Sequence, residues 1–236
     1  MRQRCGGPKS FQEYPKKGKL KDSMNLTLNK LLAKLRNEQG TVYAYVLTTI
    51  KSENSQFFQW GCAPNFQGGL ITLCTCKHFM RTWRDTFDWK GMWIAGFTSI
   101  NLMGDKRNYL FYLIKVAESF PSHKAIWEHL SEAVRSTKNA RINPLGDIYE
   151  PKQDTRDEFV YSYYYPPVKN HVHKAESQWR KDVDYKDKYG KRPALLVGGP
   201  EYSFLWSLPI IHLKNRHPRT KLWDMKVFRR TLYNAS

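Results

Sequence analysis

One short segment of the chain carries several side chains that can do chemistry. Cys74, Cys76 and His78 alternate, so on an extended strand they share one face, and Cys62 precedes them across a turn-rich loop. Thiols and an imidazole are zinc ligands, but Cys-x-Cys is not the usual Cys-x-x-Cys zinc knuckle. Small side chains packed on a strand are the simpler interpretation, and we predict no metal. Cys76 is a candidate nucleophile, because the charge of the adjacent Lys77 favours a thiolate.

A second group of polar side chains lies farther along the chain. His171 and His173 fall on one side of an extended segment, and with Asp147 and Glu176 they can form a metal site or a general acid–base pair. The alternative is that both histidines lie in an exposed loop. Asp147 and Tyr149 can bind a base edge or ribose and stack on a ring. Asp147 can equally satisfy its own turn.

The elements that must position these residues follow from hydrophobic patterning. Gly, Asn and Pro residues in 61–69 predict a loop, which leads into a short buried strand over 70–76. We predict an α+β single domain with a mixed or antiparallel sheet that can curl toward a barrel, together with a few helices. Helices are expected over 25–37 and 122–135, with Ser122 as a cap. The other expected strands cover 41–50, 92–97, 109–116 and 194–198.

The distribution of charge along the chain indicates which class of partner the protein binds. The net charge is +18, of which residues 1–39 carry +7 (ten Lys or Arg against three acidic residues) and residues 214–236 carry +6 (seven against one). We predict a basic arm with a short helix over 1–39, a core domain over 40–213 and a basic tail over 214–236. Basic ends favour a polyanionic partner, most simply nucleic acid, and DNA rather than RNA. The alternative is that they serve solubility.

Several classes of protein are not indicated. No apolar run is long enough to span a bilayer, so we expect a cytoplasmic protein without a membrane partner. Four cysteines are too few for a disulfide framework. The sequence has no P-loop, no dinucleotide-binding glycine fingerprint, no Gly-x-Ser-x-Gly elbow and no zinc-deaminase pattern.

Taken together, the motifs resemble the nucleotide-modification-associated domain family 2, proteins of bacteria and phages linked to DNA base hypermodification. The resemblance covers about residues 41–213, and its more specific blocks are Gly61-x-Ala63-Pro64-Asn65 and Leu73-Cys74-Thr75-Cys76-Lys77 with Arg81. The weaker blocks are Trp93-Ile94-x-Gly96, Gly146-Asp147-Ile148-Tyr149, His171 with His173, and the strand 195–197 that leads into 202–206. This chain departs from the family in having His78 after Lys77 and Ile148 directly after Asp147.

The resemblance implies a protein that modifies a nucleobase, or assists its modification, in a phage or bacterial DNA modification or defence system. It implies catalytic roles for Lys77, Cys76, Asp147 and His173. The substrate-binding residues that it implies are Asn65, Arg81, Gly96, Tyr149 and His171. The sequence identifies no cofactor, and enzymes of the same pathway are expected partners. Two alternatives remain, a non-catalytic reader of modified bases and an enzyme acting on a free nucleotide.

Overall fold

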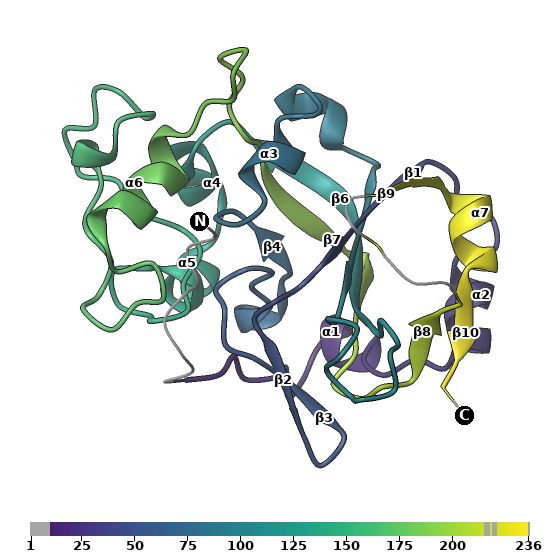
Figure 1. Ribbon diagram of the computed structural model, residues 1–236. Coiled ribbons are helices and arrows are strands. Elements are labelled where there is room, and N and C mark those ends of the chain that lie inside the picture. The colour runs from purple at the N-terminus through teal and green to yellow at the C-terminus, as the bar shows by residue number, and fades with distance from the viewer. Residues whose placement is uncertain (1–9, 215–217, 219–220, 236) are drawn as a thin grey trace. The chain divides into compact units, whose positions relative to one another are not determined.

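A six-stranded mixed sheet runs through the computed structural model, which describes residues 10–214, 218 and 221–235 (Figure 1). The strand order is β4-β7-β6-β5-β1-β9; β1 pairs parallel with β5, whereas the pairs β1–β9, β5–β6 and β4–β7 are antiparallel. The α+β class and the mixed sheet are therefore confirmed. Within the described part of the chain β4 and β9 are edge strands, so the sheet is open and does not close into a barrel. The six strands are β1 (Thr41–Val46), β4 (Thr72–Leu73), β5 (Trp93–Phe97), β6 (Leu110–Phe120), β7 (Leu195–Leu205) and β9 (Lys221–Asp224).

The remaining elements are short. Two small antiparallel sheets pair β2 (Ile50–Glu53) with β3 (Gln56–Gln59) and β8 (Ile211–Leu213) with β10 (Leu232–Asn234). In the described ranges no helix is long and apolar enough to cross a membrane. The α-helices are α1 (Lys19–Asp22), α2 (Leu28–Lys34), α3 (His78–Arg81), α4 (His123–His129), α5 (Glu132–Lys138), α6 (Glu176–Asp184) and α7 (Met225–Arg230). The 3-10 turns are η1 (Gln67–Gly69), η2 (Thr86–Trp89) and η3 (Tyr161–Tyr163).

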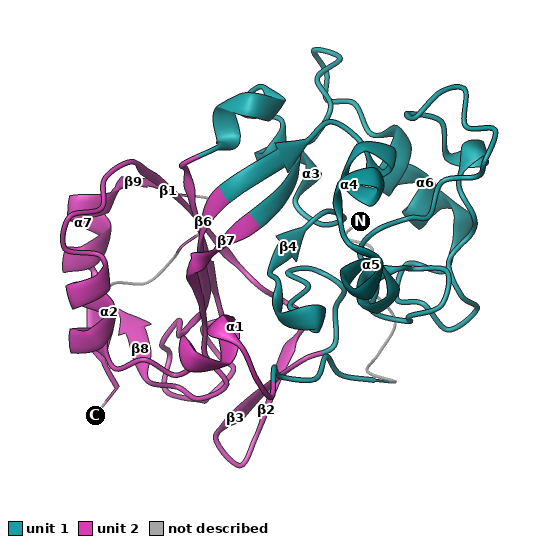
Figure 2. Cartoon of the chain, turned by 180° about the vertical axis from the view of Figure 1, so that it is seen from behind, with its two compact units in different colours: residues 1–15, 60–90, 117–197 teal, residues 16–59, 91–116, 198–236 magenta. Residues whose placement is uncertain are grey.

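The chain divides into two compact units, coloured separately in Figure 2. Unit 1 comprises residues 1–15, 60–90 and 117–197, and unit 2 comprises residues 16–59, 91–116 and 198–236. Each unit is thus assembled from three separate stretches of chain, and β6 and β7 contribute residues to both. Almost all residues implicated by the sequence fall in unit 1, the exception being Gly96.

The predicted helix over 122–135 is divided into α4 and α5. Ser122 caps α4 as expected, because its Oγ accepts a hydrogen bond from the Ala125 N–H at 3.0 Å. Leu130 and Ser131 have extended backbones, with ψ of 143° and 153°. Leu130 packs in an apolar cluster with Ile126, and Ser131 is a favoured residue before a new helix. Burial of Leu130 and the extended backbone at Leu130 and Ser131 therefore interrupt the apolar pattern that predicted one helix.

The basic C-terminal segment is not a tail where the structure describes it. Lys221–Asp224 forms β9 against β1, and Met225, Phe228 and Leu232 are buried in the core of unit 2. Leu28 and Leu31 of α2 pack in the same core, which places part of the predicted N-terminal arm inside the fold. In both segments, apolar residues at the spacing of a helix or strand lie between the Lys and Arg residues. The high net charge of these segments led to the prediction of an arm and a tail. Residues 1–9, in the remainder of that arm, lie outside the described residues.

Gly96 lies on β5 of unit 2, where a side chain has no room. A Cβ at this position would lie 2.2 Å from Cε1 of Tyr112 and 2.9 Å from Cδ1 of Leu47. Tyr112 is fixed by a 2.7 Å hydrogen bond between its hydroxyl and that of Tyr45. The glycine is therefore required by close packing of a ring against the strand. Its predicted role in substrate binding remains untested.

We expect Gly96→Ala to lower the free energy of unfolding by about 1–3 kcal/mol, because the added methyl group overpacks the Tyr112 ring. Urea unfolding of the purified protein measures the change. In a Tyr112→Val background the same substitution should cost less, since the ring is gone. Equal costs in the two backgrounds would contradict this account.

Candidate active site

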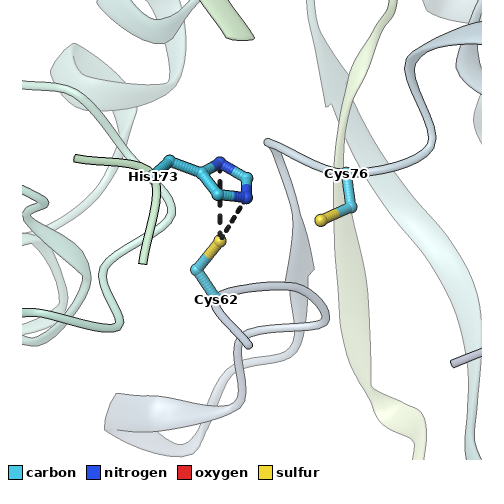
Figure 3. A group of neighbouring side chains, drawn as sticks. All are labelled: Cys62, Cys76 and His173. Atoms are coloured by element: carbon cyan, nitrogen blue, oxygen red, sulfur yellow. Dashed lines mark hydrogen bonds between the residues drawn. The ribbon is translucent and has the colours of Figure 1, made fainter. Parts of the chain in front are cut away.

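Two thiols and one imidazole meet in unit 1. The sulfur atoms of Cys62 and Cys76 and a ring nitrogen of His173 lie within 4.8 Å of one another. Cys62 Sγ is 3.9 Å from Nε2 of His173 and 4.0 Å from Nδ1, and both thiols are directed toward the ring (Figure 3). Cys62 lies in the predicted loop 61–69, Cys76 in the connection between β4 and α3, and His173 before α6. The structure therefore joins two of the predicted catalytic residues, Cys76 and His173.

Asp182 of α6 fixes the orientation of the imidazole. Its Oδ2 lies 2.7 Å from His173 Nδ1 and accepts a 2.8 Å hydrogen bond from the Tyr149 hydroxyl, and its Oδ1 lies 2.9 Å from His78 Nε2. Burial raises the pKa of Asp182, but the charge and hydrogen bonds of His173 and His78 outweigh it and lower the pKa well below its usual value. The carboxylate is ionised, so Nδ1 of His173 donates to it. In neutral His173 the other nitrogen, Nε2, is then the proton acceptor.

The neighbouring histidine holds the backbone of His173. His171 Nδ1 accepts the N–H of His173 at 2.9 Å, which leaves its Nε2 to donate to the Gly146 carbonyl at 2.8 Å. Burial lowers the pKa of His171 to about 4, so the ring is neutral at physiological pH. The predicted substrate-binding residues His171 and Tyr149 are both buried, and each has a contact that positions His173. Neither histidine lies in an exposed loop.

Arg81 holds the segment that carries Cys76. Its fully buried guanidinium donates to the carbonyls of Cys74 at 2.8 Å, Cys76 at 2.9 Å and Ala194 at 2.5 Å. These contacts leave Arg81 a positioning role, because its donors are directed at the backbone of its own fold. The backbone then turns sharply at Lys77, which has φ of 61° and precedes α3. Lys77 is thus placed directly after the reactive thiol, with a partly exposed side chain.

The loop that carries Cys62 is fixed from the N-terminal side. Gln12 donates to the carbonyls of Gly61 and Pro64, both at 2.8 Å, and accepts the N–H of Phe66 at 2.9 Å. Cys62 Sγ also lies 3.1 Å from Thr75 Oγ1, next to Cys76 in sequence. Gln12, in the predicted basic arm over 1–39, therefore lies against the loop at 61–69. A buried glutamine and three backbone groups hold the turn in place.

Asn65 and Asp147 belong to a second buried polar network. Thr72 Oγ1 donates to Asp147 Oδ2 at 2.8 Å, and Lys138 Nζ donates to Asn65 Oδ1 at 2.9 Å and to Thr72 Oγ1 at 3.0 Å. Burial raises the pKa of Asp147 against the attraction of Lys138, and it lowers the pKa of Lys138 to about 8. Asn65, Asp147, Lys138 and Thr72 are all fully buried. A proton-transfer role for Asp147 stays a prediction, and these contacts support the folding of its loop.

The sequence reasoning missed Asp182 and the contact of Cys62 with His173. Asp182 lies in a heavily charged segment in which the sequence analysis names no candidate residue. A signal was present, since Trp179, Asp182 and Val183 follow the spacing of one helical face and all three are buried. An acidic residue on an apolar face is costly to bury without partners, which marks it for attention.

The arrangement allows two kinds of chemistry. A thiol, an imidazole and a carboxylate that lie in a row in space can act as a nucleophile, a base and a group that orients the base. Cys62, Cys76 and His173 are also a donor set for zinc, with Asp182 in the position of the carboxylate that orients a ligating histidine. Cys62 Sγ is almost equidistant from the two ring nitrogens, whereas a sulfur sharing a metal with Nε2 lies nearer that nitrogen. The contact therefore favours thiol chemistry.

Comparison with family models, curated proteins and solved structures found no match. The resemblance to nucleotide-modification-associated proteins accordingly stays a prediction from the motifs. The class that the fold and site define is an α+β protein with a buried thiol–imidazole–carboxylate centre.

The protonation of His123 should appear in the pH dependence of stability. Burial lowers the pKa of His123 to about 3, and its Nδ1 accepts the N–H of Tyr149, which requires an unprotonated nitrogen. The stabilising effect of neutral His123 is complete above about pH 6.5 and is lost as the pH falls toward 3, because the unfolded chain binds the proton first. We expect the free energy of unfolding to fall less steeply with acid in His123→Phe, measured by urea unfolding between these limits. Identical slopes in both proteins would contradict this.

Thiol reactivity should single out Cys76. Among the cysteines that the structure describes, Cys76 is partly exposed, whereas Cys62 and Cys74 are buried. We expect iodoacetamide to label Cys76 ahead of Cys62 and Cys74, as measured by peptide mass spectrometry. Excess Zn²⁺ should slow this labelling by occupying both thiols and His173, and EDTA should restore it. His173→Ala should weaken the protection; labelling of Cys74 ahead of Cys76 would refute the arrangement.

Proposed function

We propose that this protein is an enzyme that modifies a nucleobase of DNA, with Cys76 as its nucleophile. The observation that carries the proposal is the alignment of Cys76, His173 and Asp182, reached from three separate segments of unit 1. The net charge of +18 supports a nucleic-acid substrate, since a polyanion is the partner that such a charge attracts. The setting is a base-modification pathway of bacteria or phages, as the motifs suggest.

The thiol needs the base in order to react. A hydrogen bond with Cys62 and the partial burial of Cys76 both raise the pKa of Cys76 well above the usual value, while His173 acts in the opposite direction. Cys76 is thus a thiol at rest. In the reaction His173 Nε2 takes the thiol proton, and Asp182 stabilises the resulting imidazolium.

A nucleobase offers a carbon for this thiolate. Attack on C6 of a pyrimidine forms an S–C6 bond and moves the electron pair of the C5–C6 double bond toward C5, which becomes nucleophilic. C5 then forms a bond to an electrophilic carbon of a co-substrate. Loss of the proton from C5 and departure of the thiolate from C6 break the C–H and S–C6 bonds and restore the C5–C6 double bond. The base must leave its stack to reach a site of this kind. Lys77 follows Cys76 and has a partly exposed side chain, where a cation stabilises negative charge on the ring.

The test is mass spectrometry of nucleosides from the DNA and RNA of cells that express the protein. A new nucleoside mass should appear with the wild type and be lost with Cys76→Ser. Asp182→Asn should reduce its formation about a hundredfold or more, because the histidine loses its orienting charge. Cys74→Ser is the matched control, since Cys74 is a buried cysteine that packs in an apolar cluster apart from His173. It should retain the activity if the variant folds.

The same experiment separates the alternatives. A new mass that survives Cys76→Ser would refute the nucleophile. A new mass confined to the free nucleotide pool would favour an enzyme of free nucleotides. No new mass, together with tighter binding to modified than to plain DNA, would replace the proposal by a reader of modified bases.

A further inference from the structure

A basic, aromatic depression lies on unit 1, apart from the thiols. It encloses about 420 Å³, and its lining includes Arg84, Asp85, Phe87, Phe159, Lys191 and Arg192. These residues come from three segments of unit 1. Arg84, Asp85 and Phe87 follow α3, Phe159 follows the loop at residues 151–158, and Lys191 and Arg192 precede β7. It therefore combines three cations, one carboxylate and two aromatic rings.

The charges of the depression do not cancel. Lys191 Nζ lies 2.9 Å from Asp85 Oδ1, so this pair is neutral as a unit. Arg192 carries a further positive charge, and no acidic side chain that the structure describes forms an ion pair with it. Guanidinium groups present paired N–H donors whose geometry matches the oxygens of a phosphate.

The ring of Phe159 orients the guanidinium of Arg192, and one nitrogen of this group has no acceptor among the described residues. The guanidinium lies 4.1 Å from the centroid of Phe159, an arrangement that fixes the plane of the group. Its Nη1 is buried, yet no described residue accepts a hydrogen bond from it. A buried charged donor without an acceptor is costly, and an anion in the depression would satisfy it.

Phe87 supplies an exposed aromatic surface beside these cations. It is 78% exposed, the highest fraction among the large apolar side chains that the structure describes as exposed. An exposed ring beside arginines matches the sites that bind single strands, where bases stack on rings and cations contact the backbone.

We propose that this depression binds one nucleotide of a single DNA strand, with its phosphate on Arg192 and its base on Phe87. The assignment of DNA as the ligand rests on the proposed function; the residues that bind it do not include the thiol centre. A strand from which a base has been unstacked offers the exposed backbone and neighbouring bases that such a site requires.

The experiment is fluorescence anisotropy with a labelled single-stranded oligonucleotide of about a dozen nucleotides, over salt concentrations from about 50 to 200 mM. Arg192→Gln should weaken binding and reduce the slope of log K against log salt by about 0.7, the value for one phosphate contact on a single strand. Phe87→Ala should weaken binding roughly tenfold and leave the slope unchanged, because stacking releases no counterions. Phe87 is exposed, so this variant should fold.

Arg141→Gln is the matched control. Arg141 also stacks on a ring, with its guanidinium 3.8 Å from the Tyr165 centroid, but its charge is paired with Glu150 at 2.7 Å. It should match the wild type in affinity and slope. If Arg192→Gln and Phe87→Ala behave like this control while the wild type binds, the depression is not the anchor and the proposed function stands. Absence of wild-type binding at low salt would overturn both proposals, and equal affinity for a mononucleotide would replace the strand by a free nucleotide.

Discussion

The buried carboxylate of Asp182 is the constraint on which the candidate site depends. A charge removed from water must be compensated by its neighbours, and breaking one partner leaves the others with an unpaired charge. Asp182 meets this requirement with His173 at 2.7 Å, the Tyr149 hydroxyl at 2.8 Å and His78 at 2.9 Å. These partners come from three chain segments far apart in sequence. Satisfying one charge therefore brings together the start of α3 and two segments without regular structure.

A second buried charge, the guanidinium of Arg81, holds the segment that carries the Cys76 thiol, as the carboxylate of Asp182 holds the His173 imidazole. Arg81 binds the carbonyls on both sides of Thr75, so the segment that ends in Cys76 cannot relax into a regular strand. This explains why the strand predicted over 70–76 is reduced to Thr72–Leu73. The apolar pattern continues beyond these residues, but their carbonyls accept from a guanidinium instead of from a neighbouring strand. The thiol and the imidazole are thus each held by a buried ion.

The sequence predicted those parts of the fold that a local pattern determines. The strands near 92–97 and 109–116 and the cap at Ser122 depend on residue type and spacing, and the structure confirms them. The strand predicted over 41–50 is confirmed only as far as Val46, and Ile50 begins β2 in a separate sheet. Cys76 and His173 were recognised as reactive types. Their meeting was not foreseeable, because it depends on Asp182, which is buried on a charged helix, and on Arg81, whose side chain donates to the carbonyls of Cys74 and Cys76. Buried ions that act over long separations leave little trace in local periodicity.

The two chemistries open to this site differ in the protons that must move. Binding of a metal to both thiols would release two protons from a buried pair whose mutual hydrogen bond holds the pKa of Cys76 high. Nucleophilic attack needs one proton to leave Cys76, and His173 is already placed to receive it, with Asp182 behind it. Cys62 is then the neighbour that keeps Cys76 protonated until substrate arrives. Under the proposed function, Cys76 therefore stays a thiol until His173 takes its proton, and the carboxylate of Asp182 stabilises the imidazolium that forms.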